Sequence, residues 1–153
     1  MTKLSWWSWG GIAGLAVILA VVAWIAWPPP TTPEPSRARE YRDFDMCILT
    51  DSNGIAAKPA SAAWAALQEV SKRHSVRLSY LTVSGEQTEA NAKQFLNTQV
   101  QQRCGIIVAV GQTQAAAADS LKASYPKVTF LSVTSDSDAA GISAKVNPLI
   151  PAA

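Results

Sequence analysis

From residue 44 onward, short apolar runs typical of strands alternate with longer stretches of helical periodicity. The predicted strands cover residues 44–50, 76–83, 105–110 and 128–133, with a short fifth at 142–146. The first predicted helix covers about 58–74 and the third covers 112–124. The second begins at Ser84 and Gln87, which have capping-box spacing, and runs to about residue 103. Strands separated by helices imply right-handed crossovers in a mostly parallel sheet. We therefore predict an α/β domain with an open sheet of four to five strands in the order 2-1-3-4-5.

The first and third predicted strands each end at a loop that could hold a ligand, because open α/β sheets bind ligands beyond the carboxyl ends of their strands. The candidate ligand-binding residues are Asp51, Ser52, Asn53 and Gly54 in the first loop and Gly111, Gln112 and Thr113 in the second. The first group suits hydrogen bonding to a sugar hydroxyl, and the second could supply backbone donors at a helix start. A purely structural alternative is open for both loops: Asp51 and Asn53 are also common turn and capping residues, and a glycine turn needs no ligand.

The amino-terminal part of the chain has a different character. Residues 10–27 carry no charge and, as a helix, would span roughly 27 Å, close to the hydrocarbon thickness of a bilayer. Tryptophans flank this stretch on both sides, as expected for indoles at two headgroup layers. We predict a short tail at 1–9, a single transmembrane helix at 10–27, a proline-rich linker at 28–43 and a domain at 44–150. A cleaved signal peptide is the alternative.

The composition argues against several classes of function. The chain of 153 residues has a net charge of +2, and its basic residues are scattered along the sequence, so no nucleic-acid partner is predicted. Two cysteines and one histidine without metal-binding spacing make a metal site unexpected, and no cofactor is predicted. No combination of acid, base and nucleophile indicates an enzyme, and His74 at a helix end is given no catalytic role. Trp64 is interpreted as a core residue.

The two cysteines could form one disulfide in an exported domain. If Asp51 and Gly111 mark equivalent strand ends, however, Cys47 and Cys104 are offset by three residues, which is about 10 Å along the strands and places the side chains on opposite faces. This reasoning favours two free, buried thiols.

The sequence TDSNGIAAKPASAAWAALQEVSK, followed by GIIVAVGQTQAAAADSLKASYPKVTFLSV, resembles the amino-terminal lobe of the basic membrane protein family. These are extracytoplasmic solute-binding proteins of ABC transporters, and several bind nucleosides. The resemblance covers about Asp45 to Asn147 and implies half of a type I periplasmic-binding-protein fold. It also implies a domain outside the cytoplasm, with a small solute and an ABC permease as partners, whereas the single membrane pass predicted at 10–27 would replace the family's usual lipoprotein cysteine.

The chain departs from that family at the ligand loop and in its extent. Residues 56–61 read AAKPAS where the family usually has paired aspartates followed by Ser-Phe-Asn, so of the ligand loop only Asp51 carries over. The family's members usually have two lobes, and the resemblance covers one. Two hypotheses follow: a membrane-anchored solute-binding component of a transporter, or a ligand-free interaction or scaffold domain that pairs with another lobe or an envelope protein.

Overall fold

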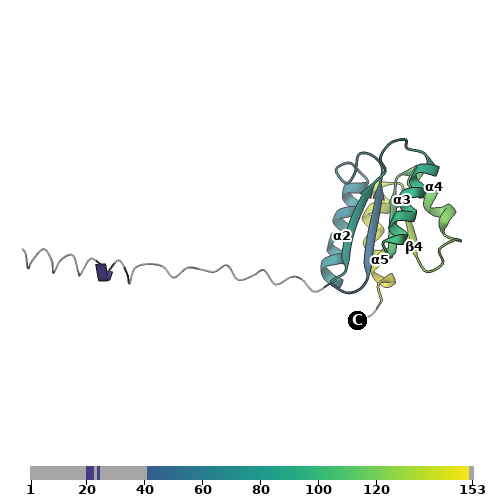
Figure 1. Cartoon of the computed structure of the whole chain (residues 1–153). Helices are drawn as coiled ribbons and strands as arrows, with labels where there is room; N and C mark the ends of the chain where they lie inside the picture. The colour runs from purple at the N-terminus through teal and green to yellow at the C-terminus, as the bar shows by residue number, and fades with distance from the viewer. Residues whose placement is uncertain (1–19, 23, 25–40, 152–153) are drawn as a thin grey trace, which may run out of the picture. The chain divides into compact units, whose positions relative to one another are not determined.

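The computed structural model describes residues 20–22, 24 and 41–151 (Figure 1). By its internal contacts the chain divides into two units, residues 1–38 and 39–153. In the first unit, residues 20–22 and 24 are helical. The predicted tail, most of the predicted transmembrane helix and nearly all of the predicted linker lie outside the described residues. Among the residues that are described, no helix has both the length and the apolar character needed to cross a bilayer.

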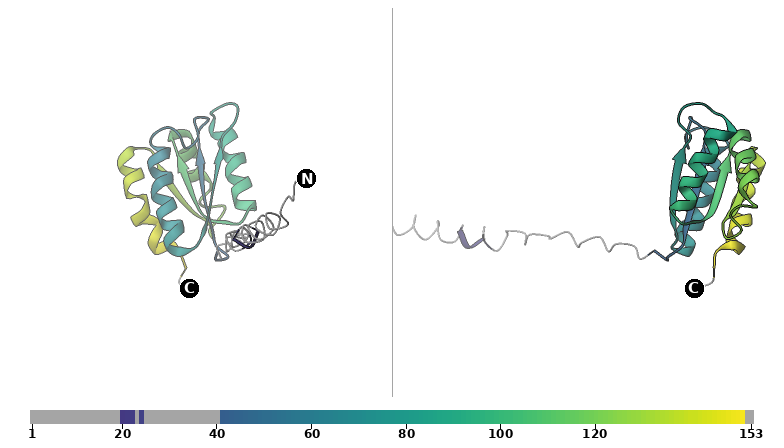
Figure 2. Two further views of the ribbon diagram at one scale, coloured as in Figure 1. Left: turned by 90° about the vertical axis from the view of Figure 1, so that its left-hand side faces the viewer. Right: turned by 45° about the vertical axis from the view of Figure 1, so that its right-hand side comes forward.

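The second unit is a three-layer α/β domain with a central sheet between two pairs of helices (Figures 1 and 2). Its elements are β1 (Asp45–Thr50), α2 (Ala60–His74), β2 (Arg77–Thr82), α3 (Glu89–Gln101), β3 (Cys104–Val110), α4 (Gln112–Leu121), β4 (Thr129–Val133), α5 (Asp136–Val146) and the 3₁₀ helix η1 (Asn147–Leu149). One core cluster lies between the sheet and α2 with α5, and the other between the sheet and α3 with α4. Every buried apolar residue described lies between Met46 and Ile150, so residues 39–153 contain the whole described core.

The four strands of the sheet are parallel and run in the order β2-β1-β3-β4. This confirms the predicted α/β class, the parallel sheet and the order of its first four strands. The predicted fifth strand at 142–146 is wrong, because these residues form the second half of α5. The hydroxyl of Ser135 caps this helix by accepting the N–H of Asp138 at 3.2 Å. Ala139, Ile142 and Val146 then recur at helical intervals and are fully buried.

The helix after β2 begins later than the predicted capping pair. Thr88, not Ser84, is its N-cap, and its hydroxyl accepts the N–H of Asn91 at 3.3 Å. Gln87 instead holds the preceding loop, since its Nε2 donates to the carbonyl of Val83 at 2.9 Å and to that of Gly85 at 3.2 Å. The loop at 84–87 is thereby tied to the end of β2.

Cys47 and Cys104 form a disulfide, with their Cα atoms 5.9 Å apart. The prediction of free thiols is therefore wrong, and the reason is a bulge at the start of β3. Asp45 pairs with Cys104 but Met46 pairs with Ile106, so Gly105 is an extra residue in β3. The extra residue turns the Cys104 side chain onto the same face as that of Cys47. Both sulfurs belong to the core cluster under α3 and α4.

Trp64 is half-buried against the other core cluster, and its ring meets Tyr80 edge to face with centroids 5.6 Å apart. The expectation that Trp64 packs with the core is confirmed.

Candidate functional site

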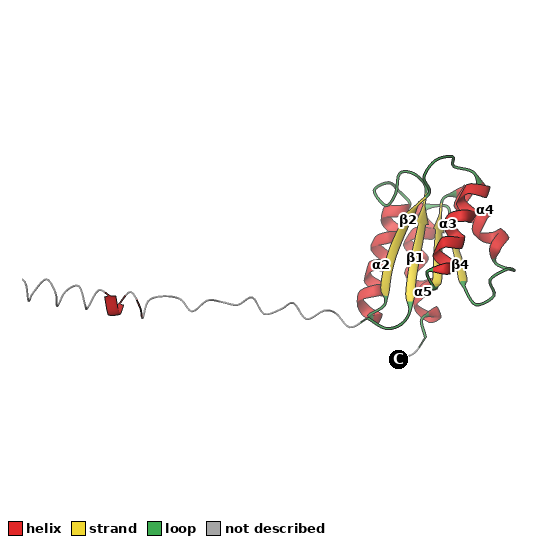
Figure 3. Cartoon of the chain, viewed as in Figure 1, coloured by secondary structure: helices red, strands yellow, loops and turns green. Residues whose placement is uncertain are grey.

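The carboxyl ends of the strands form one rim of the domain, at the top of the sheet in Figure 3. At this rim the β1–α2 loop and the end of β3 enclose a hollow of about 60 Å³. Its lining residues are Asp51, Asn53, Gly54, Ala57, Lys58, Pro59, Ala60, Val110 and Gly111. Four of the seven predicted site residues therefore meet around one space, while Ser52, Gln112 and Thr113 are not part of its lining.

Asp51 organises the first loop through its side chain and its carbonyl. Its Oδ1 accepts the backbone N–H of Asn53 at 3.0 Å, and its Oδ2 accepts the Asn53 amide at 3.1 Å. The carbonyl of Asp51 accepts the N–H of Gly54 at 3.1 Å, and Gly54 has a φ of +66°. The turn predicted as the structural alternative is thus present. Each carboxylate oxygen still has a second lone pair, so Asp51, which lines the hollow, keeps capacity to accept a further hydrogen bond.

Gly111 forms the other wall through its shape. Its φ is +110°, and a Cβ built on it would come within 2.5 Å of Gln114 Oε1. Its own N–H donates to the carbonyl of Val133 at 2.9 Å, so the first backbone donor expected there is already used. Only a residue without a side chain lets the strand turn directly into α4 at this point.

A pair of glutamines lies behind this wall and was missed by sequence reasoning. Gln114 is only 2% exposed, and its Nε2 donates to Gln87 Oε1 at 3.2 Å. The pair joins the start of α4 to the β2–α3 loop, the third loop of the rim. One signal in the sequence could have found it: Gln114 precedes Ala117 and Ala118 by one turn, and is therefore a polar residue on the buried face of a helix.

Lys58 is a further residue that the prediction of site residues did not include. It is exposed, follows the Asp51–Gly54 turn by four positions and lines the same hollow. A carboxylate and an ammonium group at one small hollow can hydrogen-bond a polar, uncharged ligand from two sides.

The end of β4 completes the rim with a capped helix start. The Asp138 carboxylate has a pKa below its usual range, first because of a hydrogen bond with the Ser135 side chain. The backbone N–H and hydroxyl of Thr134, at 3.3 and 3.1 Å from Oδ2, add to this effect. This carboxylate therefore acts as a helix-capping group.

The fold and rim define an open, parallel α/β domain. No family model matches the sequence, and no curated protein matches it. Among solved structures, the domain is similar to a fragment from Peptoclostridium difficile 630 described as a "putative lipoprotein", with a TM-score of 0.59 and 14% identity over 71% of this chain and 99% of that chain. A mannose/sorbose-specific IIA subunit of a phosphotransferase system from Enterococcus faecalis aligns with a TM-score of 0.39 and 12% identity, over 72% of this chain and 95% of that one. The first likeness supports the fold, and the second is too weak to carry an argument. The resemblance to the basic membrane protein family stays a prediction.

Proposed function

We propose that this chain is a membrane-tethered, non-enzymatic binding protein whose working surface is the rim at the carboxyl ends of β1 and β3. It would be a one-lobed relative of the basic membrane protein solute receptors, with a nucleoside-type solute as the ligand class. The observation that carries the proposal is the convergence of Asp51, Asn53, Gly54 and Gly111 around one hollow. These residues come from two loops separated by about 57 positions, and the sheet topology brings them together.

The disulfide supports a location outside the cytoplasm. Cystines such as Cys47–Cys104 form and persist in oxidising compartments and are rare where glutathione and thioredoxin keep thiols reduced. Together with the apolar stretch at residues 10–27, the bond favours a domain held at the outer side of a membrane by a single pass.

The size of the hollow defines what the domain can do alone. Sites for drug-sized ligands are about 300–1,000 Å³ and bury most of the ligand surface. The hollow here is about 60 Å³ and can accept a hydroxyl or an amide, not a whole nucleoside. The proposed site is therefore one side of a cleft, and a second lobe or an ABC permease would supply the other side.

A second candidate is a scaffold domain that has kept the fold and lost the ligand. Two observations favour it: both oxygens of Asp51 already accept hydrogen bonds from Asn53, and the hollow is small. In this case the rim would contact a partner protein directly.

Thermal unfolding of the full chain in detergent, with adenosine, guanosine, cytidine or uridine as probes, separates the two candidates. A solute at 100 times its dissociation constant stabilises the folded state by about 2.7 kcal/mol, which corresponds to several degrees. Asp51→Asn keeps an acceptor for the Asn53 N–H but removes the charge, so it should abolish the shift. Asp136→Asn, an exposed change outside the hollow, should preserve it. A flat response to all four nucleosides would refute a receptor that binds its solute without a partner and would favour the scaffold.

A further inference from the structure

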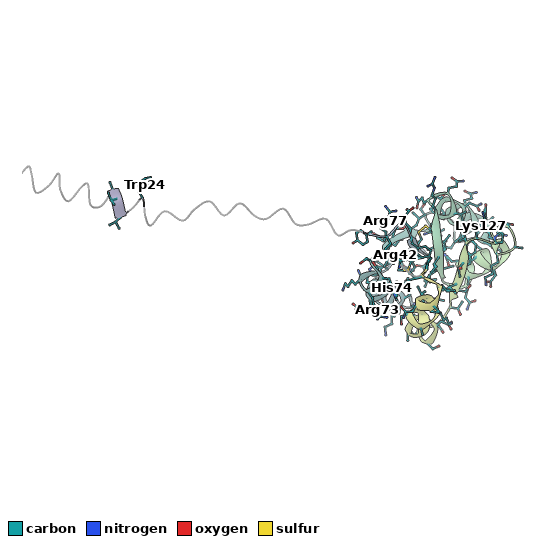
Figure 4. All side chains as sticks on the ribbon, turned by 90° about the horizontal axis from the view of Figure 1, so that it is seen from below. Trp24, Arg42, Arg73, His74, Arg77 and Lys127 are labelled. Carbon is teal, nitrogen blue, oxygen red and sulfur yellow. A yellow bond between two sulfur atoms is a disulfide. The ribbon has the colours of Figure 1, made fainter. Side chains whose placement is uncertain are left out.

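Basic side chains gather at the end of the domain where the strands begin. Figure 4 views the domain from this end and labels Arg42, Arg73, His74, Arg77 and Lys127. Arg103 belongs to the same end, because it directly precedes β3. We call this end the basal face, defined by Arg42, Arg73, His74, Arg77, Arg103 and Lys127. It lies opposite the rim that carries the proposed site.

Acidic groups offset only one part of the basal face. The Nε of Arg77 donates to Asp45 Oδ1 at 2.6 Å, and its Nη2 lies 3.8 Å from Asp43 Oδ1. Arg73, Arg103 and Lys127 form no ion pair with a carboxylate in the described part of the chain. The face therefore keeps a positive potential on either side of the Arg77 pair.

The basal face also contains a hollow of about 620 Å³ that is open to solvent. Its lining includes the basic residues Arg42, Arg73 and His74 and the apolar residues Pro148, Ile150 and Pro151. Asn147 fixes the basic side, since its Oδ1 accepts from Arg73 Nη1 at 3.3 Å and lies 3.2 Å from His74 Nε2. The last residue of η1, Leu149, is 39% exposed. Cationic groups beside an apolar lip match the chemistry of a phospholipid headgroup above its glycerol and acyl chains.

The polypeptide enters the domain at this same face. The N–H of Arg42 donates to the carbonyl of Ser75, the C-cap of α2, at 2.8 Å, and Arg42 Nη2 donates to the carbonyl of Pro151 at 2.7 Å. The sequence just before this point contains Arg37 and Arg39 together with Glu34 and Glu40, so it adds no net charge, and further back lies the uncharged stretch at 10–27. The segment that joins the domain to this stretch is therefore attached at the basal face.

The opposite rim carries the complementary charge. Its loops and helix starts contain Asp51, Glu86, Glu89, Asp136 and Asp138, against Lys58 and Lys93. A bilayer with anionic headgroups would repel the rim and attract the basal face, so the charge distribution favours an orientation with the basal face toward the bilayer.

We propose that the basal face docks on a membrane surface with anionic phospholipids, with a headgroup in the hollow between Arg73, His74 and Pro148, and that docking holds the rim away from the bilayer. The anchor on which this orientation rests is part of the proposed function, whereas the solute is not. A failure to bind nucleosides therefore leaves this inference untouched.

Lysine acylation of the full chain in lipid nanodiscs measures the docking. One set of discs contains phosphatidylcholine only, and the other also contains phosphatidylglycerol. Acylation of Lys127 on the basal face is compared with that of Lys58 on the rim. Each basic side chain near an anionic surface favours docking about fivefold. We expect Lys127 to react at least about fivefold more slowly in anionic discs, Lys58 to react equally in both, and high salt to remove the difference.

Two variants with the same change in charge make the test specific. Arg73→Gln/Arg103→Gln should weaken docking about 25-fold by removing two basal charges. Lys58→Gln/Lys93→Gln removes two rim charges and should leave the protection of Lys127 unchanged. Unfolding midpoints of both variants within a degree or two of the original would show that the fold is intact.

The outcomes separate docking from anchoring. Equal reactivity of Lys127 in both kinds of disc overturns the docking proposal. If single-stranded RNA, added separately, then protects Lys127 from acylation, the basal face is a nucleic-acid surface instead. If the chain leaves neutral discs, the anchor is refuted. Flotation with phosphatidylglycerol vesicles then decides docking: salt-reversible binding supports it, and no binding refutes it.

Discussion

Reduction of the disulfide between Cys47 and Cys104 should lower the free energy of unfolding of residues 39–153 by about 4 kcal/mol. The bond joins residues 57 positions apart. Closing a loop of that length removes about 14 cal/mol/K of entropy from the unfolded chain, which is about 4 kcal/mol at 25 °C. Small domains are stable by only about 5–15 kcal/mol in total, so the bond accounts for a large part of the expected stability.

The comparison should be made between oxidised and reduced forms of one sequence. The cysteines are only 1% and 2% exposed, so replacing both with alanine would add the cost of a cavity to the loss of the cross-link. For a urea slope of about 1–3 kcal/mol/M, reduction should lower the unfolding midpoint by about 1–4 M. The slope itself should rise, because the unfolded chain without a cross-link exposes more surface.

Mass spectrometry of the protein unfolded in a thiol-alkylating reagent provides the control: without reductant neither cysteine should be alkylated, and with reductant both should be. A loss of stability below about 1 kcal/mol would show that the unfolded chain already holds β1 and β3 together, and would refute the loop-entropy reasoning.

Three further predictions follow from local geometry. Gly111→Ala should destabilise the domain by about 1–3 kcal/mol, because the backbone at this position has φ +110° and the new Cβ would meet Gln114. Gly141→Ala should stabilise the domain by about 0.5–1 kcal/mol, because this glycine lies in a helix with open space around it. Urea unfolding measures both changes. Gln99→Met should change stability by less than about 1 kcal/mol, since it removes one hydrogen bond but also a buried Oε1 that has no partner. The pKa of Asp138 in the folded state lies below its ordinary 3.8, so the ionised carboxylate stabilises the fold above that pH, and this stabilisation disappears as the pH falls through the folded-state pKa. The difference in unfolding free energy between Asp138→Asn and the original should therefore shrink on acidification from neutral pH. A difference that grows would contradict this reasoning.

The sequence was sufficient for the fold because its signals were repeated and local. Uniformly apolar runs such as 105–110 indicated buried parallel strands, and the helical stripes between them fixed the alternation. The disulfide was missed for a reason that no periodicity shows: a one-residue bulge at Gly105 reverses the side on which Cys104 lies. Residues 142–146 were mistaken for a strand because ISAKV is short and the Ser135 cap before it was not recognised.

The candidate site was predictable only as a location. That Asp51 and Gly111 end neighbouring parallel strands follows from topology, and the structure places both around the same hollow. How the hydrogen bonds are distributed within the loops was beyond the sequence. The capture of the Gly111 N–H by Val133 depends on the packing of β3 against β4, and the Gln87–Gln114 pair depends on two loops meeting in space.

The opposite positions of rim and basal face restrict the kind of partner that could complete the cleft. The strands of five to seven residues separate the two ends by roughly 20 Å. If the basal face docks on lipid, the hollow beside Asp51 faces away from the bilayer. A permease buried in the same membrane would then reach the sides of the domain more easily than its rim, whereas a separate soluble lobe could approach the rim without obstruction. A short cross-linker attached to Lys58 should accordingly capture a soluble partner when the protein is in intact membranes. Capture of an integral membrane protein instead would contradict the proposed orientation.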